Sequence, residues 1–166
     1  MRVLVTGGAG YIGSVTTELL LEQGHSVAVI DNLERGHRSA VDPRADFVEG
    51  DLRDREWLLG AVAESDAEAI MHFAAYALVE ESMARPELYF RNNVTGGLNL
   101  AESAVRAGVR VLIFSSTCAT YGQPERMPIT EETPQCPTNP YGESKLLLEK
   151  SLRWYLELCR LRAVCL

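Results

Sequence analysis

The sequence has no apolar run long enough to cross a bilayer. Its first residues also lack the charged-then-apolar pattern of a secretory signal peptide, because Met1 to Val5 lead directly into a strand-like segment. Both absences argue against a membrane or secreted protein. We therefore expect a soluble protein of the cytoplasm.

An excess of basic residues is also missing. The chain has 16 lysines and arginines against 23 aspartates and glutamates, which gives a formal net charge of -7. A nucleic-acid partner needs a basic surface to neutralise phosphates, so this balance argues against one. The negative charge is more simply explained as a contribution to solubility.

The four cysteines form no C-x-x-C pair, so neither a zinc site nor a disulfide framework is indicated. Cys159 and Cys165 lie in apolar stretches, where we expect them to be small buried side chains. His72 ends a predicted strand, and no histidine has a second ligand at metal-binding spacing. We predict no metal site.

What is present is an alternation of short apolar runs and longer helical patterns. The 166 residues are 46% hydrophobic, enough for one domain with a real core. We predict strands over 2–6, 26–30, 45–49, 69–73, 110–115 and 162–166, and helices over 11–23, 53–63, 86–107 and 141–158. Continuous apolar strands separated by helices indicate an α/β fold, a Rossmann-type doubly wound parallel sheet with helices on both faces. Residues 122–140 form a proline-rich loop, and loops of this length in compact domains are usually functional or mobile.

A glycine-rich turn joins the first strand to the first helix. Gly7, Gly10 and Gly13 follow the spacing that permits a tight turn, close approach of the backbone to a pyrophosphate, and close packing of helix on sheet. The anion would rest on unpaired N–H groups at the positive end of the helix. The turn predicts a dinucleotide site rather than a purely structural loop.

The second strand ends in Asp31, close to the spacing expected of a carboxylate that accepts hydrogen bonds from the adenosine ribose. Such a carboxylate would repel a 2′-phosphate, so NAD is favoured over NADP. Arg35 and Arg38 lie nearby and could accommodate that phosphate, so NADP stays an alternative to NAD. Asp51 and Leu52 follow the third strand and can reach the adenine edge, although Asp51 could equally be the N-cap of the next helix.

A reaction centre is indicated by two further patterns. Ser115, Ser116 and Thr117 end the fifth strand, at the edge where parallel sheets bind ligands, although hydroxyls there could simply cap the strand's exit. Tyr141 and Lys145 are four residues apart at a helix start and share one face. An ammonium beside a phenol favours the phenolate, which makes Tyr141 a candidate general base.

Together these residues resemble the extended short-chain dehydrogenase/reductase family, and within it the nucleotide-sugar 4-epimerases. The matching stretches lie at residues 5–14, 31–33, 50–52, 72–75, 92–94, 114–117, 121–122 and 140–145, so they run through the whole chain.

The resemblance implies a role for each matching position. Tyr11 and Ile12 would touch the pyrophosphate, and the adenosine would be held by Asp31, Asn32 and Leu33. The nicotinamide ribose region would be lined by Phe73, Ala74 and Ala75, with Asn92 beneath and Ser115 nearby. Thr117 would orient the sugar 4-hydroxyl, Tyr141 would take its proton and Lys145 would anchor the ribose.

The implied reaction interconverts UDP-glucose and UDP-galactose by transient oxidation at C4, with NAD held throughout. Val15, Ala77 and Glu80 depart from the usual epimerase pattern and bear on the sub-type. Sugar 4,6-dehydratases carry Asp-Glu after the threonine, whereas Cys118 and Ala119 stand here. Another NAD-dependent sugar-nucleotide enzyme (a decarboxylase, uronate epimerase or reductase) and a non-catalytic NAD-binding regulator remain the alternatives.

The sequence stops inside the apolar run at 161–166, while the family continues into a smaller substrate domain. We expect residues 1–166 to be a dinucleotide-binding domain that is incomplete at its C-terminus. The 141–158 helix is apolar around nearly its whole circumference. One face should meet the sheet, and the other, together with the 86–107 helix, a second copy in a homodimer, unless a missing C-terminal part covers it.

Overall fold

The computed structural model describes residues 1–166 as a six-stranded parallel sheet in the order β3-β2-β1-β4-β5-β6. The strands are β1 (Arg2–Thr6), β2 (Ser26–Asp31), β3 (Asp46–Glu49), β4 (Ala69–His72), β5 (Val111–Phe114) and β6 (Arg162–Cys165). This is the predicted Rossmann-type order, and the predicted strands agree with it to within a residue or two. All strands run the same way, so their carboxyl ends form one edge of the sheet.

The strands are continuous apolar runs because the two faces of the sheet are covered separately. Along β1, Leu4 packs into one core cluster, whereas Val3 and Val5 pack into another. Successive strand residues point to opposite faces, so both sets must be apolar.

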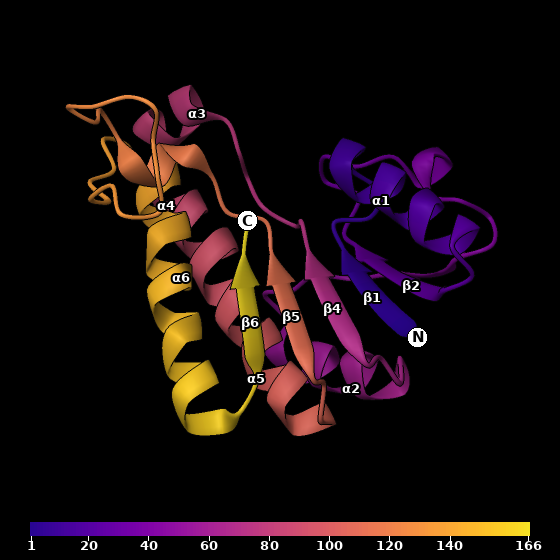
Figure 1. Ribbon diagram of the computed structural model, residues 1–166. Coiled ribbons are helices and arrows are strands. Elements are labelled where there is room, and N and C mark those ends of the chain that lie inside the picture. Colours follow the sequence, from indigo (N-terminus) through magenta and orange to yellow (C-terminus); the bar gives the residue numbers. More distant parts are fainter.

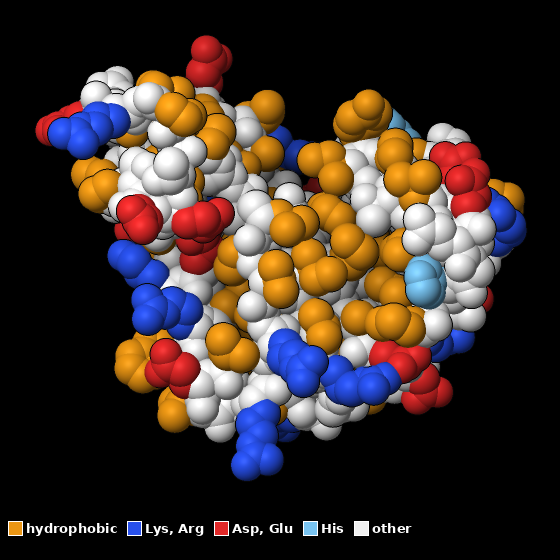
Figure 2. Space-filling model, in the orientation of Figure 1, with side chains coloured by type: hydrophobic (Ala, Val, Ile, Leu, Met, Phe, Trp, Pro, Cys, Tyr) orange, Lys and Arg blue, Asp and Glu red, His pale blue; other side chains and the backbone are white.

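Three helices cover one face of the sheet: α2 (Arg55–Glu64), α5 (Gly96–Ala107) and α6 (Pro140–Cys159). On the other face, α1 (Tyr11–Glu22) packs against β1 and β2. Figure 1 shows β4, β5 and β6 without a helix in front of them, and Figure 2 shows apolar side chains there. Helices therefore lie on both faces, as predicted, but the second face is covered at one end only.

The region predicted as one helix over 86–107 is built in three parts. It begins as α4 (Pro86–Tyr89), widens into a π-helical segment (Phe90–Thr95) and continues as α5, which ends at Gly108 with φ +74°. Wide π turns occur frequently at functional sites. This one carries Asn92 and Asn93.

Three short helices were not predicted: α3 (Val79–Ala84) and 3-10 turns at Arg38–Ala40 and Cys118–Tyr121. The expectation that Cys159 and Cys165 are buried is wrong, because all four cysteines are exposed. Cys159 lies at the outer end of α6, and Cys165 lies on the edge strand β6. None of the helices is both long and apolar enough to cross a membrane.

Candidate functional site

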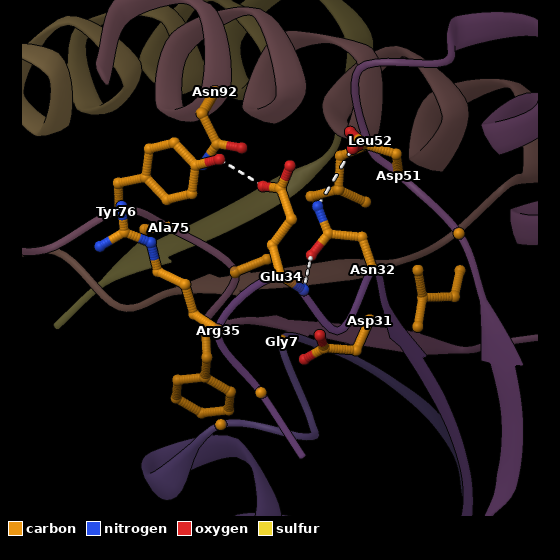
Figure 3. A pocket seen from close by; sticks show the side chains of 16 residues that line it. Gly7, Asp31, Asn32, Glu34, Arg35, Asp51, Leu52, Ala75, Tyr76 and Asn92 are labelled. Carbon is orange, nitrogen blue, oxygen red and sulfur yellow. Dashed lines mark hydrogen bonds between the residues drawn. The ribbon is translucent and has the colours of Figure 1, made fainter. Parts of the chain in front are cut away.

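A pocket opens at the carboxyl ends of β1, β2 and β4 (Figure 3), where ligands bind in open parallel sheets. Figure 2 shows a notch in the surface at this end of the sheet. Many of the predicted cofactor residues line the pocket: Gly7, Gly10, Asp31, Asn32, Asp51, Leu52, Phe73, Ala74, Ala75 and Asn92. Other lining residues were not predicted: Ile30, Glu34, Arg35, Gly36, Gly50 and Tyr76.

The remaining predicted residues lie outside this lining. Tyr11, Ile12 and Gly13 form the first turn of α1, where Tyr11 is 87% exposed. Leu33 lies beside Asp31 with φ +58°. Ser115 follows β5, and Tyr141 and Lys145 lie in the first turns of α6.

The Gly10 N–H donates to Gly7 O at 3.1 Å and closes the glycine turn. The Gly7 N–H donates to Ile30 O at 2.8 Å, and Gly7 has φ +75°. A Cβ on Gly13 would lie 2.2 Å from Gly7 O, so no larger residue fits there. No side chain caps the first turn of α1, whose N–H groups stay available. This open, positive helix end fits a pyrophosphate.

Asp31 lies at the end of β2 and is 8% exposed. Its Oδ2 accepts from the Ala9 N–H at 3.0 Å and its Oδ1 from the Leu33 N–H at 2.8 Å. These bonds fix the carboxylate against the glycine turn. Each carboxylate oxygen can accept a further hydrogen bond, which fits the hydroxyls of a ribose.

The alternative reading of Asp51 as a helix N-cap is wrong. The N-cap of α2 is Asp54, whose carboxylate accepts from the Trp57 N–H at 3.1 Å. Asp51 instead accepts from the Arg53 N–H at 2.8 Å and from Asn32 Nδ2 at 3.0 Å. The hydrogen bonds from Arg53 lower the pKa of Asp51 to about 2, against the effect of burial. Asp51 is therefore ionised at the pocket wall at neutral pH.

Lys145 is only 3% exposed and lies behind the end of β5. Its Nζ donates to Ser115 O at 2.8 Å and lies 4.7 Å from the centre of the Phe114 ring. Burial lowers the pKa of Lys145 to about 8, and the charge of Glu149 opposes this. An ammonium has three donors, so two remain for a ligand.

Tyr141 enters the first turn of α6, which Pro140 starts and Asn139 caps by accepting from the Gly142 N–H at 2.8 Å. The Tyr141 ring packs edge-on against Tyr89 at 6.3 Å, and Tyr89 is fully buried. The phenol is thus positioned by a rigid neighbour rather than by a flexible loop.

Asn93 is a positioning residue that sequence reasoning missed. Its Nδ2 donates to Tyr76 O and to Ser144 Oγ, both at 3.0 Å, and its Oδ1 accepts from the Tyr76 N–H. Ser144 in turn donates to Tyr141 O at 2.7 Å. Asn93 therefore joins the pocket wall to the turn of α6 that carries Tyr141. The only signal in the sequence was its place in the matching stretch 92–94, beside Asn92.

Thr117 lies in a neighbouring hollow rather than in the pocket itself, together with Ser116, Gln135 and Glu149. Glu149 accepts hydrogen bonds from the Ser116 hydroxyl and from Gln135 Nε2. Thr117 caps the turn at Cys118–Tyr121 by accepting from the Ala119 N–H at 3.2 Å. Glu149 thereby fixes the strand exit beside Thr117, which the sequence did not indicate.

His72 is buried at the end of β4. Its Nδ1 is 2.7 Å from Thr6 Oγ1, and its ring stacks on Phe114. Burial lowers the pKa of His72 to about 3, and the positive charge of Lys145 acts in the same direction. The imidazole is therefore neutral and joins β4 to β1.

A parallel sheet of this order, with a glycine turn after β1 and a buried carboxylate after β2, defines a Rossmann-type dinucleotide-binding protein. Tyr141 and Lys145 lie four residues apart in the first turns of α6, at the same edge of the sheet. The chain belongs to the NAD dependent epimerase/dehydratase family, whose model matches residues 3–166.

Among its relatives, the chain is 51% identical to UDP-glucose 4-epimerase of Lacticaseibacillus casei, over 93% of the chain and 46% of the relative. A solved structure of UDP-glucose 4-epimerase from Brucella ovis in complex with NAD is 47% identical, with a TM-score of 0.96 over 99% of this chain and 50% of that one. The enzyme from Thermotoga maritima, solved with UDP-glucose, is 34% identical, with a TM-score of 0.96 over 99% of this chain and 54% of that one. The chain spans about half the length of the relatives it matches.

Proposed function

We propose that residues 1–166 form the NAD-binding domain of a UDP-glucose 4-epimerase, which interconverts UDP-glucose and UDP-galactose. The observation that carries the proposal is the placement of Tyr141 and Lys145 on one helix, at the sheet edge that also carries the pocket. A nucleotide-binding module without chemistry has no need of a buried lysine beside a tyrosine at that edge. The names of the relatives support the same conclusion. The cytoplasmic location stays a prediction.

The pocket and the residues next to it would supply a partner for each part of NAD. The first turn of α1 at Tyr11 and Ile12 would hold the pyrophosphate, and Asp31 the adenosine ribose, with Asn32, Leu33, Asp51 and Leu52 around the adenosine. Phe73, Ala74, Ala75, Asn92 and Ser115 would line the nicotinamide side. When it is bound, NAD can reversibly accept a hydride from a sugar carbon.

The protein's own groups then act on the sugar hydroxyl. Thr117 would orient the 4-hydroxyl, and Tyr141 would take its proton as general base and return it as general acid. Lys145 would bind the ribose through its free N–H groups. Because the Ser115 carbonyl fixes the ammonium at 2.8 Å, the ammonium is in place before substrate binds.

A direct assay tests the activity. Full-length protein loaded with NAD should convert UDP-galactose to UDP-glucose, measured with a coupled UDP-glucose dehydrogenase. Protein that binds NAD but converts neither sugar nucleotide would contradict the epimerase proposal. Turnover of a UDP-uronate instead would favour the uronate epimerase or decarboxylase alternative.

We also propose that the protein is a homodimer through α6. Leu146, Leu148 and Leu152 face the core, whereas Leu147, Trp154 and Leu158 are exposed at helical spacing. On α5 the large apolar side chains are buried or half-buried, so α6 supplies most of the exposed apolar surface.

Replacing Trp154 with glutamate should convert the dimer to a monomer, because the charge would have to be buried without a partner. Light scattering on the full-length protein measures this, with Arg153→Glu as a control for a charge change on the same turn. Unaltered mass for Trp154→Glu, or a monomeric wild type, would contradict the α6 interface.

A further inference from the structure

All but one of the charged residues that line the pocket are acidic. Asp31, Glu34 and Asp51 line it, and Arg35 is its only cation. In dinucleotide-binding proteins, an arginine near the ribose carboxylate is what accommodates the 2′-phosphate of NADP. Arg35 follows Asp31 by one short turn, so its position alone would allow NADP.

The Arg35 guanidinium is, however, already paired. Its Nη2 donates to both carboxylate oxygens of Glu81, at 2.7 and 2.6 Å. Its Cζ lies 4.2 Å from the centre of the Tyr76 ring. Figure 3 shows the guanidinium turned toward Tyr76 and away from Asp31. Glu81 lies on α3, a helix far from β2 in the sequence, so this pairing is not a local turn contact.

Glu81 is itself held in place. Its Oε2 lies 2.7 Å from the hydroxyl of the buried Tyr89, whose one proton it shares with Leu78 O. The hydrogen bond from Tyr89, followed by that from Arg35, lowers the pKa of Glu81. Glu81 therefore remains an anion and keeps one orientation toward Arg35.

The other charged residues near the pocket also disfavour a 2′-phosphate. Glu34 accepts from the Tyr76 hydroxyl and, at 3.1 Å, from Arg53, and it places a carboxylate at the pocket wall (Figure 3). Arg38, the other candidate for a 2′-phosphate, lies over the Phe47 ring at 4.4 Å and does not line the pocket.

We propose that Glu81 is a specificity-determining residue that holds Arg35 away from a 2′-phosphate and so keeps the pocket selective for NAD. The inference rests on the proposed function, because it concerns the cofactor of that same site. Asp31 repels the phosphate directly, whereas Glu81 removes the one group that could attract it. The carboxylate competes with a phosphate for the guanidinium, because Nη2 already donates to both oxygens of Glu81 in a charge-assisted pair.

The test is cofactor binding to full-length protein freed of nucleotide, measured by calorimetry with NAD and with NADP. Glu81→Gln should raise the affinity for NADP relative to NAD by roughly tenfold, the value of one hydrogen bond to a charged group. Glutamine still accepts from Tyr89, so α3 keeps its packing. Glu80→Gln makes the same charge change on the adjacent exposed residue of α3 and should leave the ratio unchanged.

Two further variants test whether the effect of Glu81 on NADP binding acts through Arg35. Adding Arg35→Ala to Glu81→Gln should abolish the gain, and Arg35→Ala alone should leave NADP binding as weak as in the wild type. A wild type that binds NAD, with an unchanged NADP ratio in Glu81→Gln, would overturn the role of Glu81. Weaker NADP binding in Arg35→Ala alone would also overturn it, because Arg35 would then already be free. A wild type that does not bind NAD would instead contradict the proposed function.

Discussion

Replacing Tyr141 with phenylalanine should lower kcat by about a thousandfold, the contribution typical of a general acid–base group. The change removes only the hydroxyl, and the ring can still pack edge-on against Tyr89 at 6.3 Å. NAD affinity should change little, because the phosphate turn and Asp31 lie elsewhere in the site. Steady-state kinetics on the full-length protein, with cofactor binding measured in parallel, gives both quantities.

Tyr155→Phe is the matched control for this variant. It makes the same chemical change on the same helix, at a half-buried position that does not line the pocket. It should leave kcat unaltered. A Tyr141→Phe enzyme with near wild-type turnover would show that another group moves the proton of the 4-hydroxyl.

Replacing Lys145 with methionine should abolish most of the turnover and yet stabilise the fold. The shift in pKa from 10.5 to about 8 shows that burial disfavours the ammonium. Removing the charge relieves roughly 3 kcal/mol, and losing the hydrogen bond to Ser115 O offsets about 1 kcal/mol of that. We therefore expect the free energy of unfolding at pH 7 to rise by about 2 kcal/mol. Urea denaturation measures the difference.

The pH dependence of this difference has a definite sign. Between pH 8 and 10.5 the unfolded wild type keeps the Lys145 proton and the folded wild type loses it, so its stability rises with pH. The methionine variant has no such term, so its advantage should shrink across this window. Lys150→Met, at an exposed position of α6, should change neither stability nor turnover appreciably. A less stable Lys145→Met protein would show that the ammonium is better compensated in the fold than its burial suggests.

The strands and the main helices could be predicted because their signals are local. An apolar run such as Val3 to Val5 needs cover on both faces, wherever the rest of the chain goes. The 86–107 region shows the limit of such signals. Its apolar period predicts a helix but not the π segment at Phe90–Thr95, which packs against α6 in the fold.

The placement of the candidate site could be predicted where it depends on short spacings. Gly13 and Asp31 lie at fixed spacings from a strand end, which the sequence displays. The N-cap alternative for Asp51 failed because a strand–helix loop contains several acids, and only the fold selects Asp54. The prediction that Cys159 and Cys165 are buried failed because apolar neighbours along the chain do not show which side of an element is covered.

The sequence by itself determined the parallel α/β fold, the glycine turn after β1, the carboxylate at the end of β2, and the placement of Tyr141 and Lys145 on one helix. These depend on periodicity and on spacings of a few residues. Only the tertiary structure decided which charged and polar side chains pair with one another. Arg35 meets Glu81 and Asn93 meets Ser144 across wide separations in the chain, because strand order brings those segments to one edge of the sheet. The same arginine that left the cofactor open in the sequence becomes, once paired, a reason to expect NAD.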